Sequence, residues 1–505
     1  MVKKTDKKIL QYPLYLFLLP LFFVFHGYTE NFGLITIADC LQLLATYYAA
    51  SGIMYLLFYL FYRNSNKASL VCAYLFSFYF FFGAIHDFLK SHIIFASKFS
   101  VLLPVFFILF ICLLVYLKKT GALFLKLTFF LNVLLAVYLI TDFVSVAWKL
   151  LHPNPDSLST YGFKKNESYK PCANCPSPDI YFLLFDEYSS TADLKQTFNY
   201  NNSALDSFLS VKGFSNQSAS YSNYNFTPFS MASILNMNYL KGIKDVNEIT
   251  IADYASCNNL IRNNQVIQFL SSRYYDIVNY SIFDLAGHPA LIEQPLLPVK
   301  ARLITEQTLY NRFIHDIAWN FYMGPLEIKW LTQNVIYLNL NNNNRLLQLV
   351  KEESRTVSGR PRFVYAHFEM PHPPFYYDKN FQMRSKQDLT AELLGGHIQS
   401  YTGYLPYVNG KIMELVDTIQ KNTNHSAVIV IMGDHGYRAE LKGIPHDRFF
   451  KNLNAVYFPD KNYSLLNDSI SGVNQFRVIF NTLFKQSLPL LKDSTVFLTD
   501  AAPGK

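Results

Sequence analysis

The chain has 505 residues, of which 51% are hydrophobic and 17% are aromatic, and its formal net charge is +8. This composition is too apolar for an ordinary soluble protein of this length. The positive charge is spread along the chain and forms no basic and aromatic platform. This argues against a nucleic-acid partner and suits contact with anionic lipid head groups.

The apolar residues crowd into the first 150 positions, where we predict five membrane-spanning helices. The predicted spans cover residues 9–28, 34–62, 69–89, 100–117 and 123–148. Each is near or above the ~20 residues that a helix needs to cross a bilayer. The first is not a signal peptide, because no small-residue cleavage site follows it and a second span begins within a few residues. Residues 1–150 are therefore predicted to form a transmembrane helical domain, which makes the protein membrane-integral.

Basic residues flank these spans unevenly. They precede the first span and occupy the loops after the second and the fourth, as Lys3, Lys4, Lys7, Lys8, Arg63, Lys67, Lys118 and Lys119. The opposite loops hold only Lys90 and Lys98 near the helix ends. Because cytoplasmic loops are enriched in lysine and arginine, the N-terminus is predicted to be cytoplasmic. Five spans then place everything after Trp148 outside the cytoplasm, so we expect a multi-pass protein of the plasma (inner) membrane.

Ionisable side chains inside or at the ends of these spans allow two interpretations. They are Asp39, His86, Asp87 and Asp142. Such groups are costly in a membrane and are often functional, and His86 with Asp87 could shape a lipid-facing entrance. The simpler interpretation makes them interfacial residues or hydrogen-bond partners between helices.

A linker at residues 151–178, rich in Pro, Asn, Ser and Lys, separates the membrane domain from the rest of the chain. It contains Cys172 and Cys175, on the predicted oxidising side of the membrane, where a local disulfide is expected. A redox pair or a zinc half-site stays open. The first lacks the usual strand context, and the second lacks a matching pair of ligands.

After the linker, strand and helix patterns alternate. The predicted strands cover residues 179–185, 276–281, 362–368 and 427–432, with 454–458 as an edge strand. The helical patterns cover residues 201–211, 227–236, 258–272, 326–350 and 395–419, and the asparagine run 341–344 is expected to interrupt a helix. This alternation predicts an α/β sandwich over residues 179–505, with helices on both faces of a largely parallel sheet.

Polar motifs follow the ends of three predicted strands. They are Asp186-Glu187, His372-Pro373-Pro374-Phe375 and Gly433-Asp434-His435-Gly436. The carboxyl ends of the strands form the ligand-binding edge of such a sheet, so we expect these motifs to meet there. A fourth motif, Thr227-Pro228-Phe229-Ser230, opens a predicted helix. A proline at a first helical position would leave the Thr227 hydroxyl at the N-cap.

Taken in order, these motifs resemble the alkaline phosphatase and sulfatase superfamily. The resemblance is narrower to its membrane-bound branch, which includes lipoteichoic acid synthases and lipid A phosphoethanolamine transferases. It covers residues 178–485, about three fifths of the chain, and the motifs are more specific as an ordered set than one by one. It implies an alkaline-phosphatase-like catalytic domain outside the cytoplasm.

The resemblance also implies roles for individual residues. Asp186, Asp434 and His435 would bind a divalent metal ion, for which mixed oxygen and nitrogen ligands suit manganese or zinc. Thr227 would complete the metal shell and act as nucleophile, because metal coordination makes a threonine hydroxyl nucleophilic near neutral pH. His372 matches the histidine that contacts the oxygens of the transferred group.

Neighbouring residues have weaker claims. Ser230, one helical turn after Thr227, is the rival nucleophile, and Glu187 stands where sulfatases have a second acid and relatives often have glycine. Four further residues could reach metal or phosphate but are better explained as packed or solvated residues: His288, His367, Arg438 and His446.

We therefore predict a sulfatase-like, metal-dependent phosphotransferase or phosphodiesterase that acts on a phospholipid head group or an envelope glycan through Thr227. One alternative is a phosphatase or sulfatase acting on soluble esters, and another is a catalytically inactive envelope-assembly module. Sulfatases that use formylglycine begin this helix with Cys or Ser in a Cys/Ser-x-Pro-x-Arg pattern, which Thr227 does not match. An inactive module has no need to keep costly clustered ligands.

Overall fold

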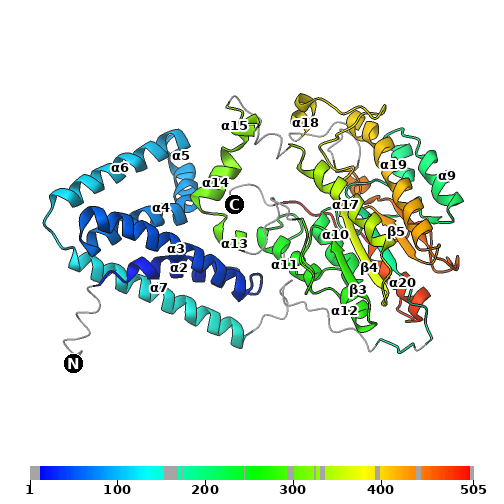
Figure 1. Cartoon of the computed structure of the whole chain (residues 1–505), viewed down its shortest axis with the longest axis horizontal. Coiled ribbons are helices and arrows are strands. Elements are labelled where there is room, and N and C mark those ends of the chain that lie inside the picture. Colours follow the sequence, from blue (N-terminus) through cyan, green and yellow to red (C-terminus); the bar gives the residue numbers. More distant parts are fainter. Residues whose placement is uncertain are drawn as a thin grey trace. The chain divides into compact units, whose positions relative to one another are not determined.

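The structure is a computed structural model, and it describes residues 12–152, 169–172, 174–243, 245–292, 301–322, 326–329, 336–392, 398–438 and 445–500. Its internal contacts divide the chain into two compact units, whose elements are labelled in Figure 1. The first unit contains Met1–Pro155 and Pro298–Leu326, and the second contains Asp156–Leu297 and Glu327–Ala502. Residues 298–326, which lie in sequence within the predicted catalytic domain, thus cluster with the first unit.

The first unit is built from long apolar helices. These are α2 (Tyr15–Glu30), α3 (Ile37–Tyr62), α4 (Ser65–His92), the short α5 (Ile94–Ser97), α6 (Phe99–Lys119) and α7 (Leu125–Leu151). Four of them, α3, α4, α6 and α7, are long and apolar enough to cross a membrane. Helix α2 has 16 residues, about 24 Å, which is less than the ~30 Å of a bilayer core. The first predicted span is therefore shorter than expected over the described residues.

Helices α3 and α4 each begin with a side-chain cap. The Thr36 hydroxyl accepts a hydrogen bond from the Asp39 backbone at 3.1 Å and caps the start of α3. The Asn64 side chain does the same for α4, accepting from the Lys67 backbone at 3.1 Å. Such caps satisfy backbone donors that the first turn of a helix leaves without partners.

The ionisable residues of these helices have partners in other elements. Asp142 of α7 lies 3.0 Å from the Nδ1 atom of His26 of α2, and Asp87 of α4 forms an ion pair with Arg312. Both contacts agree with the interpretation that these groups are hydrogen-bond partners between helices.

Three short helices from the middle of the chain complete the first unit. They are α13 (Arg302–Thr305), α14 (Leu309–Asp316) and α15 (Trp319–Tyr322). Helix α13 contacts α2, and α14 contacts α4. The Gly83 N–H of α4 donates to the Gln307 carbonyl at 2.7 Å, and a Cβ at Gly83 would lie only 2.8 Å from that oxygen. Glycine therefore permits the close approach of this segment to α4.

The second unit contains a six-stranded mixed sheet. Its strands, in spatial order, are β2 (Ser215–Asn216), β6 (Asn454–Tyr457), β5 (Val428–Met432), β1 (Ile180–Phe185), β4 (Arg362–Phe368) and β3 (Asp276–Tyr280). Strands β5, β1, β4 and β3 pair parallel to one another, whereas β6 pairs antiparallel with β5 and β2 pairs antiparallel with β6. The prediction of a parallel sheet thus holds for four strands. Residues 454–457 do not form the edge, because β2 pairs outside them.

Helices cover both faces of this sheet, as an α/β sandwich requires. Alternate residues of β1 face two separate hydrophobic cores, Tyr181, Leu183 and Phe185 on one side and Ile180, Phe182 and Leu184 on the other. The first core is closed by α9 (Ser203–Val211), α17 (Leu338–Arg355) and α19 (Ile398–Asn422). The second is closed by α10 (Thr227–Asn236), α11 (Ile251–Arg262), α12 (Gln265–Ser272) and α20 (Gln475–Phe484). A strand buried on both faces explains its continuous apolar sequence.

Two helix predictions were wrong in detail. The asparagine run 341–344 does not interrupt a helix but lies inside α17, because the buried Asn343 side chain exchanges two hydrogen bonds with the Glu369 backbone, at 3.0 and 2.8 Å. The stretch 258–272 is two helices rather than one. Asn264 caps the second of them, α12, by accepting from the Ile267 backbone at 2.9 Å. The remaining elements are short: α8 (Thr191–Gln196), α18 (Lys386–Glu392), η1 (His446–Phe450) and η2 (Gly472–Asn474).

A disulfide joins Cys172 and Cys175, whose Cα atoms are 5.5 Å apart. This is the local bridge predicted for the linker. It precedes β1 and stands apart from the polar cluster described next.

Candidate active site

Three adjacent parallel strands bring the candidate metal ligands together. Asp186 directly follows β1, His367 is the penultimate residue of β4, and Asp434 lies two residues after β5. Strand β1 lies between the other two, and its Leu184 is level with both His367 and Met432. The three side chains therefore leave neighbouring strands at the same edge of the sheet, which is where ligand sites of such sheets form.

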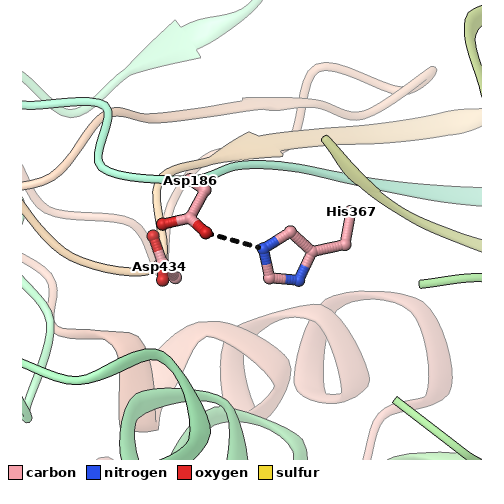
Figure 2. A group of neighbouring side chains, drawn as sticks. All are labelled: Asp186, His367 and Asp434. Atoms are coloured by element: carbon pink, nitrogen blue, oxygen red, sulfur yellow. Dashed lines mark ion pairs between the residues drawn. The ribbon is translucent and has the colours of Figure 1, made fainter. Parts of the chain in front are cut away.

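Asp186, His367 and Asp434 form a compact buried group, shown in Figure 2. One ligand atom from each lies within 4.8 Å of the other two, and the His367 Nε2 atom is 3.6 Å from Asp186 Oδ2. Asp186 Oδ1, Asp434 Oδ2 and both ring nitrogens of His367 have no hydrogen-bond partner among the described residues. Buried polar atoms without partners are costly, and a shared cation would satisfy them. The donor set thus fits a divalent metal ion.

The pKa shifts of Asp186 and Asp434 also favour a cation bound between them. Burial raises the pKa of Asp186, but contacts with His367 and His372 outweigh burial and hold the pKa below its ordinary value. Burial and the neighbouring Asp186 raise the pKa of Asp434. Two buried carboxylates this close disfavour ionisation of both, and a cation between them relieves that repulsion.

Thr227 faces this group from helix α10. The helix begins at Thr227 itself, with Phe226 as the N-cap, so the threonine is one position further into the helix than predicted. Its hydroxyl lies 3.1 Å from the Nε2 atom of His435. The other ring nitrogen, Nδ1, donates to the Gly436 carbonyl at 2.9 Å, which orients the ring with Nε2 toward Thr227.

His435 joins the two halves of the site. Its Nε2 atom is 3.1 Å from Asp434 Oδ2 as well as from the Thr227 hydroxyl. The compact group of three ligand atoms does not include His435 or Thr227, and His367 takes a place in it that we had not expected. The pairing of β1 with β4 carries His367 to the same sheet edge as Asp186.

Ser230 points at the backbone of the site. Its buried hydroxyl donates to the Asp434 carbonyl at 2.6 Å, one helical turn beyond Thr227. This bond fixes the turn that carries Asp434. The geometry thus gives Ser230 a contact with the backbone of Asp434, whereas the Thr227 hydroxyl contacts the side chain of a candidate ligand, His435.

His372 lies beside the group on the loop after β4. It is half-buried, and its Nδ1 donates to the Pro373 carbonyl at 2.8 Å. Burial lowers the pKa of His372, but Asp186 and Glu187 outweigh burial and raise it. A raised pKa favours the protonated imidazole, which can donate hydrogen bonds to an anion.

A pocket of about 620 Å³ opens next to these residues. It is lined by the polar side chains of Glu187, His372 and Arg438 and by the rings of Phe226, Phe449 and Phe497. His446 also lines it and stacks on Phe449 and Phe497, with ring centroids 5.1 and 5.0 Å apart. Arg438 and His446, interpreted from the sequence as solvated residues, therefore face this pocket. His288 does not line it, and its backbone closes a turn with Leu285.

Comparison with known proteins finds a family model that matches part of the chain. Residues 300–474 match the model of the sulfatase family. This range includes His367, His372, Asp434 and His435, whereas Asp186 and Thr227 lie before it. No curated protein sequence matches the chain.

Solved structures similar to the chain include two C-terminal periplasmic domains of EptC proteins and one phosphonate monoester hydrolase. The C-terminal periplasmic domain of phosphoethanolamine transferase EptC from Campylobacter jejuni is 13% identical, with a TM-score of 0.37, over 62% of this chain and 92% of that one. The zinc complex of the EptC domain from Escherichia coli is 8% identical, with a TM-score of 0.38, over 66% and 94%. Phosphonate monoester hydrolase from Silicibacter pomeroyi is 12% identical, with a TM-score of 0.37, over 63% and 75%. The match over residues 300–474 agrees with the sulfatase resemblance that the ordered motifs predicted.

Proposed function

We propose that the chain is a membrane-anchored, metal-dependent phosphotransferase or phosphodiesterase that acts outside the cytoplasm on a phospholipid head group or an envelope glycan. One observation carries the proposal. The Thr227 hydroxyl, at the start of α10, is 3.1 Å from His435 Nε2, and His435 in turn adjoins the buried group that contains Asp434 and Asp186. A hydroxyl beside clustered ligands is the arrangement that nucleophilic catalysis with a metal requires.

Asp186, His367, Asp434 and His435 would hold the divalent cation, which we propose to be zinc or manganese. When bound, it would neutralise charge on the phosphoryl oxygens and lower the pKa of a nearby hydroxyl. His372 would donate hydrogen bonds to those oxygens. The four candidate metal ligands lie at or just after the ends of β1, β4 and β5, so the rigid sheet sets their spacing.

The reaction would proceed in two displacements. The Thr227 oxygen forms a bond to phosphorus while the bond from phosphorus to the donor oxygen breaks, and the proton that leaves the Thr227 hydroxyl ends on the released donor oxygen. An acceptor hydroxyl or water then forms a bond to phosphorus, the bond from phosphorus to the Thr227 oxygen breaks, and the proton of the attacking group ends on Thr227. Attack by a hydroxyl gives transfer, and attack by water gives hydrolysis.

Two other functions, a formylglycine-dependent sulfatase and an inactive assembly module, have less support from the site. Formylglycine chemistry needs a cysteine or serine precursor, and the first residue of α10 is Thr227. Sulfate-ester hydrolysis by that route is therefore not available to this site. An inactive assembly module would not need to keep Asp434 and His435 fully buried beside Asp186.

The Thr227 variants test the proposal. We expect Thr227→Ala to lose turnover by several orders of magnitude, because it removes the covalent route. Thr227→Ser should keep part of the activity, since the hydroxyl remains but the methyl group that fixes its rotamer is lost. Ser230→Ala should retain substantial activity, because its hydroxyl only contacts the Asp434 carbonyl.

Intact-mass analysis of the full-length protein after incubation with phospholipids and Mn²⁺ or Zn²⁺ provides the direct readout. An adduct that maps to Thr227 would identify the nucleophile and the donor fragment together. Robust turnover by a folded Thr227→Ala protein would refute the proposal and would leave Thr227 with a purely structural role.

A further inference from the structure

Arg438 contacts the chain neighbours of Asp186 and of Thr227. It lies three residues after His435, and its Nε atom donates to Glu187 Oε1 at 2.8 Å. Its guanidinium carbon lies 5.1 Å from the centroid of the Phe226 ring. Glu187 directly follows Asp186, and Phe226 directly precedes Thr227. The two partners of Arg438 are therefore the chain neighbours of a candidate ligand and of the candidate nucleophile.

Glu187 has a backbone conformation that serves the same arrangement. Its φ angle is 61°, in the left-handed region that few residues other than glycine adopt. In this conformation its N–H donates to Asp434 Oδ1 at 3.0 Å, and its carbonyl accepts from the Tyr401 hydroxyl at 3.0 Å. Strained residues held by several bonds cluster at functional sites. In this conformation the Glu187 carboxylate accepts the hydrogen bond from Arg438.

This pairing separates Glu187 from the metal ligands. Its carboxylate is bonded to Arg438 and is not part of the compact group formed by Asp186, His367 and Asp434. Sulfatases have a second acid at this position, so the sequence left a ligand role open. The geometry instead makes Glu187 the residue that holds Arg438 in place.

The guanidinium keeps most of its hydrogen-bonding capacity for a ligand. Arginine has five N–H donors, and only Nε is used by Glu187. No other hydrogen bond of Arg438 is found among the described residues, and the residue lines the pocket of about 620 Å³ with His372. Its side chain is 27% exposed, against 5% for Glu187. The two terminal nitrogens of the Arg438 guanidinium thus face the pocket, while Nε is anchored by Glu187.

The chemistry of those nitrogens selects an anion with paired oxygens. A planar guanidinium binds phosphate in a bidentate manner, and partial desolvation strengthens such charge-assisted bonds. The other acid of the pocket, Asp500, accepts a hydrogen bond from the Tyr254 hydroxyl at 2.9 Å and is exposed. Asp500 thus has a partner of its own, and the acid that anchors Arg438 is Glu187, the chain neighbour of Asp186.

We propose that Arg438 binds two non-bridging oxygens of the phosphoryl group that is transferred, and that Glu187 and Phe226 position it for this contact. This inference deepens the proposed function and rests on it for the identity of the transferred group. Arg438 is then a substrate-binding residue, and Glu187 is a positioning residue that does not bind the metal.

Phosphate binding and metal content together test the inference. The probe is inorganic phosphate, titrated calorimetrically into the zinc-loaded full-length protein in detergent, with zinc measured by mass spectrometry. Arg438→Gln should weaken phosphate binding about 10- to 100-fold, because it loses charge-assisted hydrogen bonds. Zinc content should not change. Arg438→Lys keeps the charge but loses the fork, so its loss should be smaller than that of the glutamine variant.

Two further variants separate positioning from ligation. Glu187→Gln can still accept a bond from Arg438, so we expect a smaller loss of phosphate affinity than in Arg438→Gln, with full zinc content. A loss of zinc in Glu187→Gln would overturn the assignment, because it would make Glu187 a ligand. Arg360→Gln is the matched control, since Arg360 is an exposed arginine paired with Asp276 at the far end of the sheet.

The outcome is independent of the nucleophile. If Thr227→Ala protein turns substrate over, the proposed function fails, yet the dependence of phosphate binding on Arg438 is still measured. Unchanged phosphate affinity in a folded, zinc-loaded Arg438→Gln protein would refute the inference, whatever the Thr227 variants show.

Discussion

Gly433 and Gly436, which flank Asp434 and His435, leave no room for a side chain. A Cβ at Gly436 would lie 2.3 Å from the Arg448 carbonyl, and one at Gly433 would lie 2.5 Å from the Tyr188 carbonyl. Both atoms are backbone and cannot move aside cheaply. The glycines of this motif are therefore required by close approach of the chain to itself.

We predict that Gly436→Ala displaces His435 and lowers metal affinity about 10-fold or more, since residues that support ligands have effects of this size. Gly410→Ala is the matched control. Gly410 lies inside α19 with open space where a Cβ would be, so alanine there should stabilise the protein by about 0.5–1 kcal/mol. Thermal unfolding and zinc titration of both variants check this. Normal zinc affinity in Gly436→Ala would contradict the prediction.

Metal binding itself is the second prediction at the scale of residues. We expect Asp434→Ala and His367→Ala to lose bound metal while the sheet stays folded. Both side chains lie at strand ends, so their removal does not disturb the rest of the hydrophobic core. Zinc or manganese should raise the melting temperature of the unaltered protein, since a ligand that binds only the folded state stabilises it. The rise should vanish in both variants and persist in His288→Ala. A His367→Ala protein with full metal content would remove His367 from the ligand set.

At the scale of elements, helix α17 shows tertiary contacts overriding local preference. Asparagine has a lower helix propensity than alanine by roughly 0.5 kcal/mol, so the run 341–344 argued for an interruption. Asn343 instead exchanges two hydrogen bonds with the Glu369 backbone just after β4. These bonds satisfy an N–H and a carbonyl that would otherwise be buried without partners.

The buried hydrogen bonds of Asn343 and the low helix propensity of asparagine predict opposite changes in the free energy of unfolding when Asn343 and Asn344 are each replaced by alanine. Asn343→Ala should destabilise the protein by about 1–3 kcal/mol, because the lost bonds leave buried backbone groups unsatisfied. Asn344→Ala should stabilise it slightly, since Asn344 is exposed in the same helix and only propensity acts there. Denaturant unfolding of both variants measures the difference. Stabilisation by Asn343→Ala would show that the buried bonds contribute less than propensity.

At the scale of the whole molecule, the orientation of the membrane helices decides where the site works. A reporter fused after Trp148 should be active only outside the cytoplasm, because the basic loops after α3 and α6 are predicted to be cytoplasmic. Cytoplasmic activity of this fusion would reverse the predicted orientation. A second reporter before Tyr15 addresses α2, which is short for a span. A cytoplasmic signal there supports five crossings, and an external one supports four.

The sequence by itself determined the features that repeat along the chain. Hydrophobic length indicated the membrane helices, of which four reach full length, and alternation placed every long strand to within a residue or two. The order of the motifs was enough to predict the sulfatase family. These features depend on neighbouring residues, so a local pattern carries them.

The tertiary structure decided which distant residues meet. Because β1 lies between β4 and β5, His367 falls beside Asp186 and Asp434, although nothing near His367 in sequence distinguishes it from a packed strand histidine. The pairing of Arg438 with Glu187, 251 residues away, has the same origin. So does the clustering of 298–326 with the membrane helices. Such contacts depend on strand order and on long-range closure of the chain, which no periodic pattern within one segment specifies.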